Sequence, residues 1–99
     1  MSAAQDDLGP SASYLTLDEG AAVVSSDGER IGRVDEVLAD PQADVFDGIV
    51  IGMGPLGLDR RYVDAEHVDR IHERGVVVSI TATAAAALPE PRRQAPGER

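Results

Sequence analysis

The sequence contains no cysteine, no lysine and no tryptophan, and it has one Phe and two Tyr among its 99 residues. Without cysteine, the chain cannot form disulfides, thiolate metal sites or a cysteine nucleophile. Because aromatic residues are so few, the 42% of hydrophobic residues must build a core mainly from Val, Ile, Leu and Ala. A chain of this length is enough for one domain with one modest core.

Long apolar runs are also missing, and none approaches the ~20 residues that a membrane-spanning helix needs. The first residues, MSAAQDDLGPSAS, are acidic and polar, unlike a secretory signal with its basic start and apolar middle. We therefore expect a cytoplasmic protein that does not insert into a membrane.

Negative charge dominates the chain. Its 18 acidic and nine basic residues give a net charge of −9, and every basic residue is Arg. An acidic body repels phosphate backbones and anionic lipid surfaces, so the composition disfavours nucleic-acid binding. Arg60-Arg61 and Arg92-Arg93 are the paired basic residues, and such pairs usually solvate a loop.

Composition divides the chain into three parts. Residues 1–15 are rich in Ser, Ala, Asp and Gly without periodicity, and we expect them to form a flexible arm. Residues 16–90 have the texture of short strands and form the predicted domain. Residues 91–99 form a tail that is expected to be disordered.

The stretch VVSSDGERIGRVDEVLADP, residues 23–41, is either a phosphate-binding loop or the corner of a hairpin. A phosphate cradle needs several Gly residues leading into a helix, whereas here a single Gly with acidic neighbours leads into a strand. Asp27-Gly28 predicts a tight turn, because Gly tolerates a positive φ. Gly32 weakens a helix and suits a bulge, so it favours a strand over residues 31–39 despite the helical spacing of the apolar residues.

Further short strands are predicted over residues 45–53, 60–63, 68–72 and 76–80. Residues 81–88 are Ala-rich and predict a short helix, with Thr81 or Thr83 as its cap and Pro89 as its stop. Several short strands with regular turn signals indicate an all-β barrel or sandwich with a C-terminal helix. The residues assigned to structural turns are Asp27, Gly28, Gly32, Gly48 and Gly75.

Five motifs follow one another along residues 16–90. They are Gly20-x-x-Val23, Asp27-Gly28-Glu29-x-Ile31-Gly32-x-Val34 with a strand ending at Asp40-Pro41, Phe46-Asp47-Gly48-Ile49-Val50, Arg61-Tyr62-Val63 with Ala65-Glu66-x-Val68, and a last hairpin followed by Leu88-Pro89. In this order they resemble the PRC-barrel family, with a departure at Asp64, where such sequences often have Pro. The resemblance implies a small PRC-type β-barrel of about six strands with a short C-terminal helix. It also implies a barrel that docks onto another macromolecule or onto a copy of itself.

Catalysis is not predicted from any group of residues. A small barrel is filled by side chains and offers little cleft in which a pair of carboxylates could act, and the acidic residues lack the spacing of a calcium loop. His67 and His72 have no neighbouring thiolates, and Ser25, Ser26 and Ser79 show no arrangement with a base. We expect no enzyme, no metal site and no cofactor.

The Gly-rich loop over residues 52–58 is the strongest candidate for function. Met53, Leu56 and Leu58 cannot all reach a core from a turn, so one or two of them should close the barrel mouth. Leu56 and Leu58 are expected to protrude and to meet a partner, with Arg60 and Arg61 beside them. The hypothesis is a non-catalytic protein-interaction module that forms a homo-oligomer or docks onto a larger complex.

Two alternatives remain open. A ribosome- or RNA-associated factor would use Arg60, Arg61, Arg92 and Arg93, and its binding would weaken steeply as the salt concentration rises. A sensor of a small ligand or a cation would be stabilised against unfolding by what it binds.

Overall fold

The computed structural model of the protein describes residues 8–91. The fold is all-β, with six strands and one short helix near the C-terminus, so the predicted fold class is confirmed. The elements are, in chain order, the 3-10 turn η1 (Tyr14–Thr16), strands β1 (Ala22–Val24), β2 (Arg30–Asp40) and β3 (Val45–Met53), the turn η2 (Pro55–Gly57), strand β4 (Asp59–Asp64), the turn η3 (Ala65–His67), strands β5 (Val68–His72) and β6 (Gly75–Val78), and helix α2 (Ala82–Ala85).

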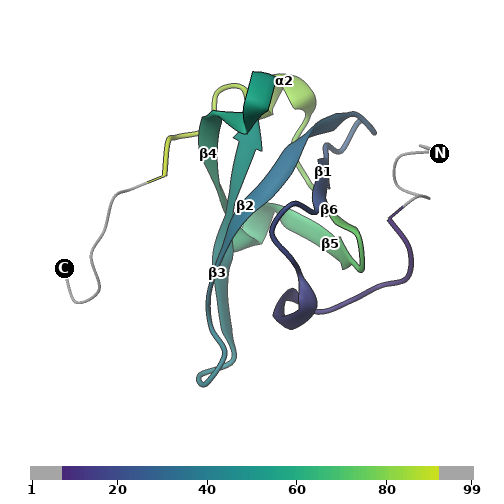
Figure 1. Ribbon diagram of the computed structural model, residues 1–99, viewed down its shortest axis with the longest axis vertical. Coiled ribbons are helices and arrows are strands. Elements are labelled where there is room, and N and C mark those ends of the chain that lie inside the picture. The colour runs from purple at the N-terminus through teal and green to yellow at the C-terminus, as the bar shows by residue number, and fades with distance from the viewer. Residues whose placement is uncertain (1–7, 92–99) are drawn as a thin grey trace.

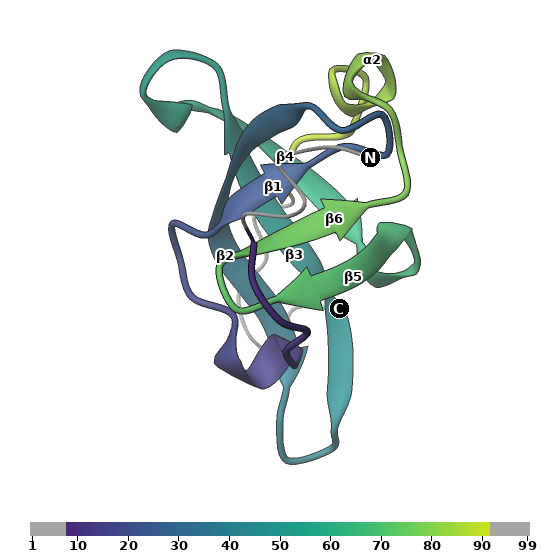
Figure 2. The same ribbon diagram turned by 90° about the vertical axis from the view of Figure 1, so that its right-hand side faces the viewer.

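The six strands form one curled sheet in the order β4-β3-β2-β1-β6-β5 (Figure 1). Neighbouring strands are antiparallel except β1 and β6, which run parallel. Figure 2 shows β1, β6 and β5 side by side on one wall of the barrel. The edges of the sheet are β4 and β5, which follow one another in the chain through η3.

Strand β2 carries irregularities that explain the ambiguous spacing of its apolar residues. Its register against β3 shifts between Val34 and Glu36 and again between Leu38 and Ala39. Its pairing with β1 also shifts close to Gly32. Because each extra residue reverses the alternation of side chains, a bulged strand imitates helical spacing. The prediction of a bulged strand is confirmed.

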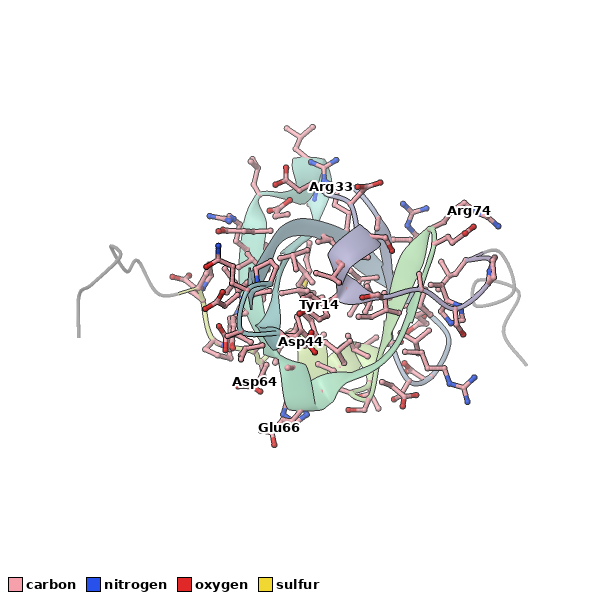
Figure 3. All side chains as sticks on the ribbon, turned by 90° about the horizontal axis from the view of Figure 1, so that it is seen from below. Tyr14, Arg33, Asp44, Asp64, Glu66 and Arg74 are labelled. Atoms are coloured by element: carbon pink, nitrogen blue, oxygen red, sulfur yellow. The ribbon has the colours of Figure 1, made fainter. Side chains whose placement is uncertain are left out.

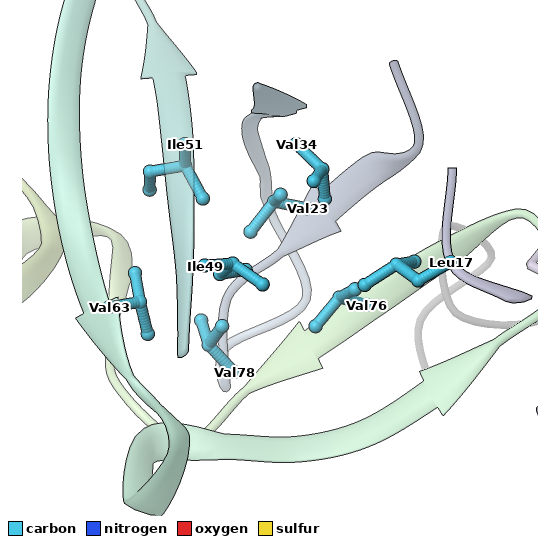
Figure 4. Packing of buried hydrophobic residues seen from close by; sticks show 8 residues of the cluster. All are labelled: Leu17, Val23, Val34, Ile49, Ile51, Val63, Val76 and Val78. Atoms are coloured by element: carbon cyan, nitrogen blue, oxygen red, sulfur yellow. The ribbon is translucent and has the colours of Figure 1, made fainter. Parts of the chain in front are cut away.

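An aliphatic core fills the inside of the curled sheet (Figure 4). Burying one Val or Ile side chain completely contributes about 1.5–3 kcal/mol relative to leaving it exposed. The single Phe of the chain, Phe46, is partly buried and packs against this cluster. The buried members are Leu17, Val23, Val34, Ile49, Ile51, Val63, Val76 and Val78.

Asp27 and Gly28 form the turn between β1 and β2, as predicted. Gly28 has a φ of 85°, and its N–H donates to the carbonyl of Ser25 at 3.0 Å. The Asp27 carboxylate accepts from the hydroxyl of Ser25 and, at 3.1 Å, from the N–H of Ala82. The turn is therefore linked to the first residue of α2.

The other glycines assigned to turns lie inside strands. Gly32 belongs to β2, Gly48 to β3, and Gly75 is the first residue of β6. A Cβ on Gly32 would lie 2.3 Å from the carbonyl oxygen of Gly52, and one on Gly48 would lie 2.3 Å from that of Val63. For Gly32 and Gly48, the close approach of a neighbouring strand leaves no room for a side chain.

Helix α2 is shorter than the predicted helix over residues 81–88. Thr81 is its N-cap, as expected, and accepts from the N–H of Ala84 at 3.1 Å. Leu88 instead packs against the core, and its carbonyl accepts from Nη1 of Arg61 at 2.6 Å. After α2 the chain continues in tighter turns, in which the N–H groups of Ala87 and Leu88 donate to the carbonyls of Ala84 and Ala85 at 3.0 and 3.2 Å.

Both edges of the sheet bind segments from near the ends of the chain. At β5, residues 8–12 follow the strand and the turn after it. Ser11 pairs with His72, and the N–H of Arg74 in that turn donates to the carbonyl of Leu8 at 2.9 Å. On β4, the N–H of Tyr62 donates to the carbonyl of Pro89 at 2.9 Å. The described part of the expected flexible arm thus lies against the barrel. Residues 1–7 and 92–99 lie outside the described residues.

Candidate functional site

The loop between β3 and β4 holds two large apolar side chains in solvent. Leu56 is 79% exposed and Leu58 is 75% exposed. Leu56 has a φ of 62°, in the left-handed region, where a residue with a Cβ is strained by about 1–2 kcal/mol. The sheet therefore maintains a costly backbone conformation that presents an apolar side chain to water.

Met53, which the sequence grouped with these two leucines, has a different position. It is the last residue of β3, is partly buried, and packs against the core cluster. Its side chain therefore contributes to the border of the core rather than to the exposed loop. The exposed apolar pair is therefore Leu56 and Leu58 alone.

An open depression of about 410 Å³ lies beside Leu56 on the outside of the barrel. The sequence predicted little cleft, and this depression was missed because β2, β3 and η2 contribute to it together. Four glycines line it, so backbone rather than side chains forms much of its floor. Its lining residues are Arg30, Ile31, Gly32, Arg33, Gly52, Gly54, Leu56 and Gly57. We call this depression, together with Leu56 and Leu58, the loop surface.

Two arginines line the depression, and the Asp35 carboxylate lies beside them, 2.9 Å from where a Cβ on Gly52 would be. Arg33 lies on the outside of the barrel (Figure 3), and its Nη2 donates to the carbonyl of Leu56 at 3.2 Å. This bond holds the loop against β2. Nε of Arg33 lies 3.9 Å from the Asp35 carboxylate, so the pairing is loose and leaves the guanidinium half exposed. Arg30, also exposed, lines the same depression.

Arg60 and Arg61 do not form one basic cluster, because adjacent residues of a strand point to opposite faces. Arg60 pairs with Asp35 at 3.3 Å and with Glu36 at 3.6 Å. Arg61 pairs with Asp59 at 2.9 Å and binds the carbonyl of Leu88. Both guanidinium groups are engaged within the protein, which weakens the RNA-binding alternative. Arg92 and Arg93 lie outside the described residues.

The histidines have separate environments. Nδ1 of His72 lies 2.8 Å from the carbonyl of Gly9, and His67 lies 3.9 Å from the Glu66 carboxylate. Within residues 8–91, no three or more Asp, Glu or His residues gather in a way that could hold a metal ion. In the same part of the chain, no helix has both the length and the apolar character needed to cross a membrane.

The groups with shifted pKa values lie away from the loop surface. A hydrogen bond from Ser25 lowers the pKa of Asp27 below its ordinary value. A hydrogen bond to Asp44 raises the pKa of Tyr14, and burial raises that of Tyr62. Each of these three side chains also forms a hydrogen bond within the fold. The Tyr14 hydroxyl, for example, donates to the Asp44 carboxylate at 2.8 Å (Figure 3).

A scan against protein families matched residues 13–85 to the PRC-barrel domain. A comparison with curated proteins gave no match. The matched range contains all six strands and the loop between β3 and β4, and it agrees with the motifs recognised over residues 16–90. The chain therefore belongs to the PRC-barrel domain family.

Proposed function

We propose that this protein is a non-catalytic interaction module that works in the cytoplasm and docks through its loop surface onto a protein partner, including a second copy of itself. PRC-barrel domains are in general non-catalytic domains of the interaction and assembly type. The observation that carries the proposal is the exposure of Leu56 and Leu58 in a loop with strained backbone. A strained conformation that also exposes apolar surface persists only when the surrounding structure imposes it, and such sites are commonly functional.

The chemistry of the loop surface defines the partner. Leu56 and Leu58 offer apolar contact area, and Arg30 and Arg33 offer guanidinium groups in the neighbouring depression. A complementary surface presents an apolar side chain close to one or two carboxylates, since Arg pairs well with carboxylates. A second copy of this acid-rich chain carries carboxylates that meet this requirement.

The salt dependence of self-association separates this proposal from nucleic-acid binding. Two copies with a charge of −9 repel one another, and added salt screens this repulsion. Self-association through the loop surface is therefore expected to strengthen from low to physiological salt. Binding to RNA would weaken over the same range, because phosphate contacts release counterions.

The test is light scattering over a concentration series of the full chain. We expect a monomer–dimer equilibrium that the double variant Leu56→Asp, Leu58→Asp abolishes. The matched control is Leu15→Asp, which places the same charge on another leucine that is 60% exposed. A strict monomer at all concentrations, or a dimer that survives the double variant, would contradict association of two copies through this surface.

A further inference from the structure

A second apolar cluster lies on the outer face of the sheet, apart from the core. There Leu8, only 3% exposed, packs against Val24 of β1 and Val77 of β6. These two residues are directly opposite each other in the parallel pair, and Ala22 borders the cluster. This outer face is itself apolar, and Leu8 covers it.

Gly75 shapes the position that Leu8 occupies. A Cβ on Gly75 would lie 2.4 Å from Cδ2 of Leu8 and 2.7 Å from the carbonyl oxygen of Ala22. The Leu8 side chain therefore packs directly on the backbone of β6, and any residue larger than glycine at position 75 would displace it. Val24, Val77 and the backbone at Gly75 thus form a socket that fits one branched side chain.

Backbone hydrogen bonds extend this contact along β5. The carbonyls of Leu8 and Pro10 accept from the N–H groups of Arg74 and Glu73 at 2.9 and 3.0 Å. The N–H of Ala12 donates to the carbonyl of Ile71 at 2.8 Å. An extended segment that pairs with a sheet edge and inserts a side chain into a socket is a common mode of peptide recognition.

Two further side chains, those of Tyr14 and Leu17, hold the segment against the barrel. The ring of Tyr14 stacks on Phe46 with centroids 5.2 Å apart, and Leu17 is buried in the core cluster. Residues 8–17, which we call the N-terminal segment, thus contact the barrel through a few separate anchors. They connect to β1 through the turn at residues 18–21, which is closed by a 3.2 Å bond from the N–H of Ala21 to the carbonyl of Asp18. The end of this turn is also bonded to β2, since the N–H of Gly20 donates to the carbonyl of Val34 at 2.7 Å and the carbonyl of Ala21 accepts from the N–H of Val34 at 2.8 Å.

Gly20 gives this turn the character of a hinge. Its φ is 91°, at the position of a β-turn where a positive φ calls for glycine, and no atom lies within 4 Å of where its Cβ would be. A residue with a Cβ at this position is strained by its backbone alone. Opening the turn into an extended linker would remove that strain.

We propose that two copies of the chain exchange their N-terminal segments, so that Leu8 of one copy fills the socket on β1 and β6 of the other. Each copy carries the same segment and the same socket, so the contacts of residues 8–17 with the barrel are reproduced between copies. Only the bonds of the opened turn, from Ala21 to Asp18 and from Gly20 to Val34, are given up. Exchange of an identical element is a route to dimers that needs no new contact surface. The proposal is independent of the loop surface, because residues 8–17 and Leu56 lie on separate parts of the molecule.

The first test is Gly20→Ala in the full chain, followed by sedimentation equilibrium. Strain in the closed monomer is relieved in both hinges of the exchanged dimer, so the association constant should rise on the order of thirtyfold to several-hundredfold. The matched control is Gly28→Ala, which adds similar strain at φ 85° in a turn that exchange does not open. Adding Leu8→Asp to Gly20→Ala should return the chain to monomer.

Equal association constants for the Gly20 and Gly28 variants, or a dimer that survives Leu8→Asp, would overturn the proposal. A second measurement avoids reliance on altered chains. In a mixture of isotope-labelled and unlabelled wild-type protein at high concentration, we expect intermolecular nuclear Overhauser effects between Leu8 and Val77. A dimer that lacks these intermolecular effects, or the absence of any dimer, would contradict the exchange of N-terminal segments. A dimer lost only on Leu56→Asp, Leu58→Asp would support the loop surface instead.

Discussion

Asp27 joins two residues that are far apart in the sequence. Its carboxylate accepts from Ser25 within the β1–β2 turn and from Ala82, 55 positions later, at the start of α2. The sequence predicted the turn from the Asp-Gly pair, because that signal is local. It contained no signal for the bond to α2, which depends on how the two ends of the domain meet.

The shifted pKa of Asp27 predicts how its contribution depends on pH. Because the folded pKa lies below the unfolded value, the carboxylate stabilises the fold fully above the ordinary pKa of about 3.9 and loses this effect as pH falls through the folded pKa. Asp27→Asn should therefore lower the free energy of unfolding at pH 7, and the difference from wild type should shrink below about pH 4. Urea unfolding of both chains at several pH values measures it. If the difference in the free energy of unfolding between the two chains stays constant with pH, the charge of Asp27 does not contribute to stability.

The sequence predicts correctly that Gly32 is structurally important, but it gives only part of the physical reason. A bulge was predicted there from poor helix propensity, and the register of β1 does shift nearby. The stronger constraint is the carbonyl of Gly52, 2.3 Å from where a Cβ would be, and it depends on the pairing of β2 with β3. Pairing across strands cannot be read from the residues around Gly32.

Gly32→Ala should separate β2 from β3 locally and cost about 1–3 kcal/mol, as overpacking of tight contacts usually does. Urea unfolding gives the cost, and hydrogen exchange should show faster exchange for amides of the β2–β3 pair. Unchanged stability in Gly32→Ala would contradict the close approach.

At the level of secondary structure, the strands were predictable and the covering of their edges was not. Alternation marks β3, and turn residues mark the ends of the other strands. In contrast, residues 8–12 and Pro89 bind the edges of β5 and β4 through backbone groups, which every residue carries. The position of Leu88 after α2 likewise depends on distant contacts, with the core and with Arg61. Such contacts leave no pattern in composition.

Arg61 is expected to stabilise the β4 edge, whereas its neighbour Arg60 is not. Arg61→Ala removes a charged hydrogen bond of 2.6 Å to Leu88 and should cost about 1.5–3 kcal/mol. Arg60→Ala removes only exposed ion pairs, worth about 0–1 kcal/mol. Urea unfolding compares the two chains. Faster hydrogen exchange of the Tyr62 amide in Arg61→Ala alone would locate the effect, and equal losses in both variants would argue against it.

The whole molecule is a curled aliphatic sheet with an open depression on its outside, beside Leu56. The sequence predicted a solid interior because the core residues are Val, Ile and Leu, and it predicted protruding leucines because a Gly-rich turn cannot bury them. It did not reveal that Arg30 and Arg33 flank the same loop, since they come from β2 and the leucines from the β3–β4 connection. The function proposed here depends on this combination of apolar and charged groups on the exterior.

The most direct test of that central claim is a dilution series of the isotope-labelled full chain followed by amide chemical shifts. If the protein associates through the loop surface, the shifts that change with concentration should centre on residues 54–58 and on Arg30 and Arg33, and they should vanish in Leu56→Asp, Leu58→Asp. Changes confined to other faces of the barrel, with the loop between β3 and β4 unaffected at every concentration, would contradict the account.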